Sequence, residues 1–124
     1  MIDIEEVLVI HEILIEEFGG TKGVRDRNLL ESSIHRPFST FDGQDLYKTP
    51  VDKAAALLES IVVNHPFLDG NKRTGYTLMR LTLLQFDMDI DAAQDDKYEL
   101  VIGVAEGRIT FDQINKWIER KLKK

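Results

Sequence analysis

The segment His-Pro-Phe-Leu-Asp-Gly-Asn-Lys-Arg-Thr, residues 65–74, gathers side chains that can do chemistry around one glycine. It contains one histidine, one aspartate, one asparagine and two cations. A histidine of ordinary pKa, about 6.5, takes up a proton near neutral pH. A single carboxylate beside cations is a common anchor for Mg²⁺ that is shared with nucleotide phosphates. The segment therefore predicts phosphoryl or nucleotidyl transfer, which requires mainly positioning, charge neutralisation and one base.

The apolar residues on either side predict that this segment joins two helices, the second beginning near Asn71. The first N–H groups of a helix lack intrahelical partners and lie at the positive end of its dipole, so they bind anions. Lys72 and Arg73 are unfavourable at that end unless an anion is bound there, so they indicate a phosphate ligand. Gly70 permits a tight turn, and Asn71 either stabilises that turn or donates to the anion. The same residue types also fit a plain helix connection in which His65 only ends the first helix.

The rest of the chain has the apolar spacing and capping residues of an all-α protein. They predict helices over about residues 4–18, 26–36, 49–64, 71–86, 97–107 and 110–122. The helix from Asn71 is apolar on nearly every side, which is typical of the buried centre of a small bundle. The fifth helix is expected to bury the side that contains Tyr98, Val101, Ile102 and Ala105. Residues 37–50 lack helical periodicity and predict an ordered loop or a short hairpin.

Composition limits the class of protein. A chain of 124 residues with 43% hydrophobic content fits one domain over residues 1–124. Its net charge of −6 disfavours broad attraction to nucleic acid or to a membrane surface. The absence of cysteine excludes disulfides and thiolate metal sites. The acidic N-terminus lacks the basic region of a signal peptide, and no stretch is long and apolar enough for a membrane span, so we expect a cytoplasmic protein.

Residues 65–73 closely resemble the core motif of the Fic/Doc (Fido) family, His-x-Phe-x-[Asp/Glu]-Gly-Asn-[Gly/Lys]-Arg. The lysine in this motif is typical of the Doc (death-on-curing) branch, and residues 18–37, 45–67 and 104–110 resemble Doc-type sequence in the same order. The resemblance implies the Fido fold, with Phe67 packed under the loop, His65 as general base and Asp69 as the Mg²⁺ ligand. It also implies a group of residues that bind the phosphates of ATP, namely Gly70, Asn71, Lys72 and Arg73.

The loop at residues 37–50 falls where the family has a flap that aligns a target segment by strand-like pairing. The resemblance therefore implies that Phe41 and Tyr47 contact the protein target. Closing the loop over the core is the other possible role of these apolar residues, and it is the expected role of Leu46.

Two departures from the adenylyltransferase pattern bear on the group that is transferred. Members that transfer AMP have a glycine where Lys72 stands and a second arginine where this chain has Tyr76. The resemblance thus implies a Doc-like kinase, a toxin that transfers the γ-phosphate of ATP to a threonine of elongation factor Tu and blocks translation. A Fic-type adenylyltransferase is the first alternative, and a non-catalytic antitoxin-binding module is the second. The family's inhibitory helix motif fails here because Ile102 precedes Glu106-Gly107, so a separate Phd-type antitoxin is the implied partner.

Other polar residues are expected to be structural. A zinc helix of the form His-Glu-x-x-His fails because position 15 is Ile15, so His11 is predicted to lie at the surface or on a helix flank. His35 is expected at a helix end, and Arg80 in a structural or rim position. The acidic residues between 87 and 96 lack the glycine and final glutamate of a calcium loop, so they predict a solvated connection.

Overall fold

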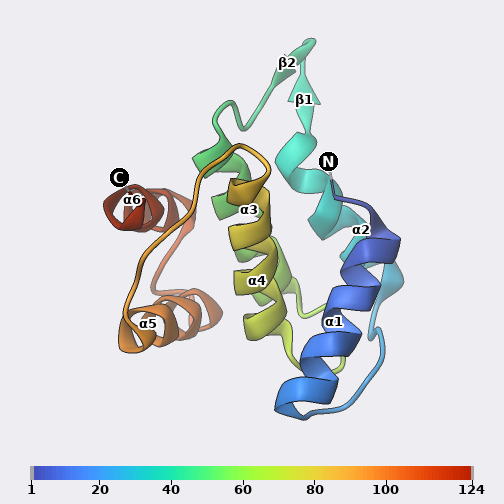
Figure 1. The fold of residues 1–124 in the computed structure, drawn as a ribbon. Helices are drawn as coiled ribbons and strands as arrows, with labels where there is room; N and C mark the ends of the chain where they lie inside the picture. Colours follow the sequence, from blue (N-terminus) through green and yellow to red (C-terminus); the bar gives the residue numbers. More distant parts are fainter. Residues whose placement is uncertain (1, 124) are drawn as a thin grey trace.

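The computed structural model describes residues 2–123 and confirms the all-α prediction with one short hairpin (Figure 1). Its helices are α1 (Ile4–Phe18), α2 (Arg27–His35), α3 (Pro50–Asn64), α4 (Asn71–Leu84), α5 (Gln94–Ala105) and α6 (Phe111–Lys121). Between α2 and α3 lie a 3₁₀ turn, η1 (Arg36–Phe38), and an antiparallel pair of strands, β1 (Thr40–Phe41) and β2 (Gln44–Asp45). None of the helices within residues 2–123 has the length and apolar character needed to cross a membrane.

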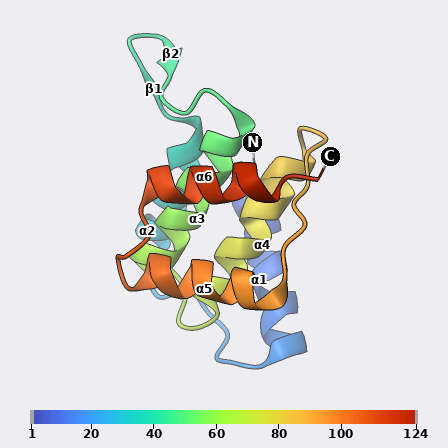
Figure 2. The same ribbon diagram turned by 90° about the vertical axis from the view of Figure 1, so that its left-hand side faces the viewer.

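The helices form three layers, with the antiparallel pair α3 and α4 in the middle (Figures 1 and 2). On one side α1 and α2 cover this pair, in a core that includes Val7, Leu30, Ile34, Leu57, Ile61, Phe67 and Leu78. On the other side α5 and α6 cover it, in a core that includes Leu58, Met79, Leu83, Leu100, Val104, Ile114 and Ile118. Both faces of the central pair are therefore covered by other helices.

Helix α3 is the more buried member of the central pair, although the sequence favoured α4 for that place. The side chain of Thr49 accepts a hydrogen bond from the Asp52 N–H at 3.0 Å and begins α3, as predicted. Small side chains from Ala54 to Ala56 then let neighbouring helices approach on several sides. Helix α4 ends at Leu84, where the chain turns outward and leaves Leu84 and Phe86 exposed.

Helix α5 buries a face that only partly overlaps the predicted one, since Val101 and Ala105 pack against the core but Tyr98 does not. It begins at Gln94, and its buried residues are Leu100, Gly103 and Val104, whereas Tyr98 is 64% exposed. The rotation of the helix follows from Gly103, because Ile109 packs directly against the space that a Cβ atom would occupy there. A close approach between these two residues is invisible to a count of apolar periodicity.

Arg80 has the structural role that was expected of it. Its Nε donates to Asp89 Oδ1 at 2.8 Å and its Nη2 to Asp89 Oδ2 at 3.0 Å. These hydrogen bonds hold the pKa of Asp89 well below its usual range. The Arg80–Asp89 pair therefore holds the connection after α4 in place. Among residues 2–123, no group of three or more acidic or histidine side chains is arranged to hold a metal ion.

Candidate active site

His65 lies at the turn between α3 and α4, where it ends α3 in a left-handed conformation, with φ 51° and ψ 56°. The ring is exposed, and its Nδ1 lies 3.1 Å from the carbonyl oxygen of Val63. Because a carbonyl only accepts hydrogen bonds, Nδ1 carries the proton of the neutral ring. The Nε2 atom of the neutral ring then keeps its lone pair, which accepts no hydrogen bond from residues 2–123.

Arg25 supports the backbone at His65, a role that the sequence did not reveal. Its Nε donates to the His65 carbonyl at 2.6 Å and its Nη2 to the Asn64 carbonyl at 2.7 Å. The backbone N–H of Arg25 also donates to the Pro66 carbonyl at 2.7 Å. A cation at a helix C-terminus satisfies carbonyl groups that have no partner within the helix. No local pattern signals this contact, because the partners lie 39 and 40 residues away along the chain.

We expect Arg25→Ala to lower the free energy of unfolding by about 1 kcal/mol, since it removes two charge-assisted but exposed hydrogen bonds. Urea unfolding followed by circular dichroism measures this change. Arg27→Ala is the matched control, because the exposed ion pairs of Arg27 with Glu5 and Glu31 should contribute less than about 0.5 kcal/mol. Equal losses in the two variants would show that Arg25 does not stabilise the end of α3.

The turn before α4 is closed by the side chain of Asn71, which is only 8% exposed. Its Oδ1 accepts from the Phe67 N–H and its Nδ2 donates to the Phe67 carbonyl, both at 3.0 Å. Of the two roles left open for this residue, the structure therefore supports stabilisation of the turn. Of the hydrogen-bond donors of Asn71, only its backbone N–H, in the first turn of α4, is then free to bind an anion.

Helix α1 packs beneath this turn, and here the prediction for His11 is wrong. The His11 ring is 4% exposed and stacks on Phe67, with centroids 3.8 Å apart and planes 5° apart. Its Nε2 donates to the Asp69 carbonyl at 2.8 Å. Gly70 has a φ of 76°, which favours glycine, and a Cβ atom there would lie only 3.0 Å from Ile15 Cδ1, so α1 packs closely against this position. The sequence could not place His11, because its partners lie more than fifty positions away.

A pocket of about 470 Å³ opens beside the turn, between α1, α4 and α5. Its wall contains the consecutive residues Asp69, Gly70, Asn71, Lys72 and Arg73. The Asp69 carboxylate accepts from the Gly70 N–H at 2.9 Å through Oδ1 and from the Thr21 N–H at 3.1 Å through Oδ2. Each oxygen has a second lone pair, so this single carboxylate fits a Mg²⁺ ion that is also held by phosphates, rather than a metal held by protein alone.

Two aromatic residues extend the pocket wall. The guanidinium carbon of Arg73 lies 4.0 Å from the centroid of the Phe18 ring, at the end of α1. Tyr76 follows one turn along α4, and burial raises its pKa to about 12, so its phenol is neutral. The Tyr76 hydroxyl is buried and has no hydrogen-bond partner among residues 2–123. This wall therefore presents a positive charge at Arg73 and a neutral polar group at Tyr76.

The structure does not bring Phe41 of the hairpin or Tyr47, which follows it, to this site. The hairpin projects from the beginning of α3, whereas His65 ends that helix, as Figure 1 shows. A helix of 15 residues separates the two ends by about 22 Å. Tyr47 is fixed in place, because its hydroxyl accepts from Arg36 Nε at 2.9 Å and its ring packs against Phe111. Phe41 is 75% exposed.

The structure overturns the expectation for Leu46, the third apolar residue of this loop. Its side chain is 56% exposed, so it does not close the loop over the core. Tyr47 does so instead, because its hydroxyl reaches the guanidinium group of Arg36.

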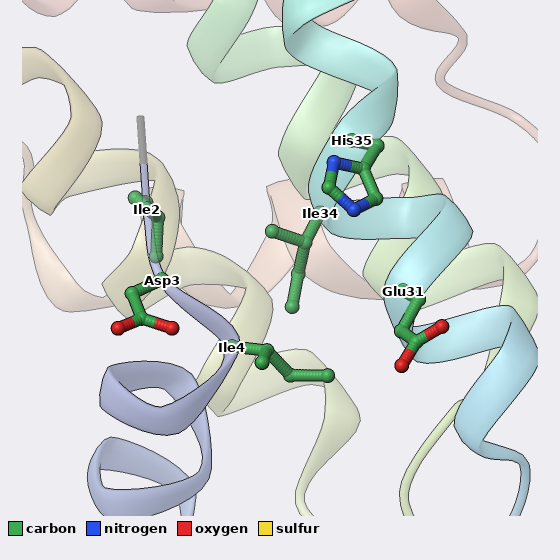
Figure 3. Close-up of a pocket in the computed structure, with 6 residues that line it drawn as sticks. All are labelled: Ile2, Asp3, Ile4, Glu31, Ile34 and His35. Carbon is green, nitrogen blue, oxygen red and sulfur yellow. The ribbon is translucent and has the colours of Figure 1, made fainter.

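A second hollow, of about 290 Å³, lies between the start of α1 and α2 (Figure 3). Its polar side chains are Asp3, Glu31 and His35, with isoleucines between them. Asp3 caps α1 by accepting from the Glu5 N–H at 3.1 Å, and Glu31 accepts from Arg27 Nε at 3.3 Å. His35 ends α2, as predicted. The residues that line this hollow include no lysine or arginine, whereas the pocket beside Asp69 has both in its wall, so that pocket is the better candidate for an anion.

Comparison with known proteins identifies the family of the chain. Residues 1–83, which contain the whole turn between α3 and α4, match the model of the Fic/DOC family. A protein named Toxin Doc, from Mycolicibacterium smegmatis, is 42% identical over 100 residues, which cover 76% of this chain and 75% of that protein. Because the family model matches most of the chain and the identity to Toxin Doc is 42%, the chain belongs to the Fic/DOC family, on its Doc branch.

Proposed function

We propose that this protein is the toxin of a toxin–antitoxin pair and acts as a Mg²⁺-dependent protein kinase. The observation that carries the proposal is the free N-terminus of α4, which faces a pocket of about 470 Å³ together with Lys72 and Arg73. The Doc toxin that is 42% identical to the chain supports the biological role. The proposed target is a threonine hydroxyl of elongation factor Tu, because residues 65–73 resemble the motif of Doc toxins.

In this mechanism the backbone N–H groups at the start of α4 and the side chains of Lys72 and Arg73 bind the phosphates of ATP. Asp69 would hold Mg²⁺ jointly with those phosphates, and the ion supplies neutralisation of their charge. The target hydroxyl oxygen forms a bond to the γ-phosphorus while the bond from that phosphorus to the β–γ bridging oxygen breaks. The hydroxyl proton moves to Nε2 of His65, and ADP leaves.

Transfer of phosphate rather than AMP is favoured by Tyr76. AMP-transferring relatives have a second arginine at this position, and a neutral phenol cannot supply that charge. We also propose regulation by a separate Phd-type antitoxin, since the inhibitory motif of the family is incomplete in this chain. The glutamate of that incomplete motif, Glu106, accepts through its Oε1 from Arg108 Nη2 at 2.9 Å at the end of α5. That glutamate is therefore engaged outside the pocket. We further propose that residues 1–124 act as one Fido domain in the cytoplasm.

The transferred group is identified by incubating the protein with Mg²⁺, elongation factor Tu and ATP labelled separately at the α and γ positions. We expect label from the γ position only, and loss of that label when Mg²⁺ is chelated or when Asp69 is replaced by asparagine. Label from the α position would instead establish an adenylyltransferase. If neither position gives label and expression of the same protein still arrests the growth of cells, the non-catalytic binding module is favoured.

A further inference from the structure

The wall of the pocket that faces α4 is formed by α5, and its charged residue is Lys97. Lys97 is half-buried, and its Nζ lies 5.7 Å from the centroid of the Tyr76 ring. It is not part of any ion pair within residues 2–123. Its position follows from the observed rotation of α5, which buries Leu100, Gly103 and Val104 and turns Lys97 toward α4.

The surroundings of Lys97 differ from those of most other cations in the structure. The chain has 22 acidic residues against 16 basic ones, so carboxylates are abundant. They pair with cations outside the pocket, as in Lys22–Glu16, Arg36–Glu59, Lys53–Asp45, Arg80–Asp89 and Lys121–Asp96. Arg73 and Lys97 lie over the aromatic rings of Phe18 and Tyr76 and have no carboxylate partner among residues 2–123. Arg36 also lies over aromatic rings, but it is paired with Glu59. A cation over an aromatic ring keeps its full charge, so Arg73 and Lys97 remain available to an anion that enters between them.

We propose that Lys97 binds a second phosphate group of the same nucleotide, from the α5 side of the pocket. The free N–H groups at a helix N-terminus form an anion site of the size of one phosphate, and α4 begins at Asn71 beside the pocket. A volume of about 470 Å³ leaves room for a longer polyphosphate chain. An ammonium group on a flexible stem reaches such a chain without a fixed geometry. The inference rests on the proposed nucleotide binding and is independent of which phosphoryl or nucleotidyl group is transferred.

The protein contains a spectroscopic probe at this wall. Trp117 is the single tryptophan of the chain, and its ring meets the Tyr76 ring edge-on, with centroids 6.4 Å apart. When a ligand draws Lys97 away from Tyr76, the charge beside this aromatic pair changes. Binding at the α5 side should therefore change the emission of Trp117.

The test uses the full chain with Lys97→Met, Lys97→Arg and the control Lys48→Met, an exposed lysine in the loop before α3. Affinities for MgATP and for inorganic phosphate are measured by calorimetry, with Trp117 emission recorded in parallel. We expect Lys97→Met to weaken MgATP binding about tenfold, equivalent to about 1.4 kcal/mol, and to leave phosphate binding unchanged. Lys97→Arg should restore most of the affinity, and Lys48→Met should match the wild type.

Methionine suits a helical position, so the variant should fold, and equal melting temperatures confirm it. Unchanged MgATP affinity in Lys97→Met would overturn the role of Lys97 while leaving nucleotide binding intact. An equal loss for MgATP and inorganic phosphate would also overturn it, because the lysine would then act on the first phosphate. If the wild-type protein bound no MgATP, both the inference and the proposed function would fall together.

Discussion

Replacing His65 with asparagine should lower the rate of phosphate transfer by a factor of about 10² to 10⁴ and leave the fold and the nucleotide affinity unchanged. Asparagine tolerates the left-handed conformation in which His65 ends α3, so the turn should keep its geometry. The exposed ring contributes no core contacts that the substitution could remove. What asparagine lacks is a basic nitrogen lone pair that can accept the proton of the target hydroxyl.

The measurements are the initial rate of γ-label transfer, the calorimetric affinity for MgATP and the melting temperature. His35→Asn is the matched control, since His35 is also exposed and also ends a helix. It should behave as the wild type in all three. His65→Ala should lose the same activity and in addition lose about 1 kcal/mol of stability, because alanine disfavours the left-handed region. Undiminished growth arrest by His65→Asn in cells would remove His65 from the mechanism and support a non-catalytic module.

The second large effect is expected at His11. Replacement by alanine should lower the free energy of unfolding by about 3 kcal/mol. Part of the loss comes from the cavity left where the ring stacks on Phe67, and part from the Asp69 carbonyl, which loses its buried donor. MgATP binding should also weaken, because that carbonyl belongs to the residue whose carboxylate lines the pocket.

Urea unfolding and calorimetry check both parts of this prediction. His11→Gln keeps an N–H donor at a similar reach, so it should recover about 1 kcal/mol relative to alanine and most of the MgATP affinity. His35→Ala should change the free energy of unfolding by less than about 0.5 kcal/mol, as an exposed histidine does. A loss for His11→Ala no greater than that for His35→Ala would mean that the stack and the hydrogen bond contribute little.

The sequence predicted the features that depend on neighbouring residues. Asp26 caps α2 through the Leu29 N–H, and Thr110 forms the capping box with Gln113, because these partners lie three positions apart. Gly19 ends α1 with a φ of 89°, which favours glycine. The five consecutive residues that line the pocket were identified for the same reason.

Features that depend on distant contacts were missed or misplaced. His11, Arg25 and Lys97 reach the turn or the pocket from other helices and loops, and nothing in their local sequence marks them. The exposed face of α5 was misjudged because Gly103 accommodates Ile109, a packing contact rather than a periodic pattern. The distance between the hairpin and His65 depends on the length of α3, which lies between them. The order of the motifs along the chain does not give this distance.

The pocket draws its wall from α1, α4 and α5, one helix from each layer of the fold. A ligand bound there contacts a helix from each of the three layers, and because it binds the native state its binding stabilises that state by linkage. At a ligand concentration of one hundred times the dissociation constant, this linkage contributes about 2.7 kcal/mol. With ATP as that ligand, the resistance of the protein to proteases would rise and fall with the energy charge of the cell.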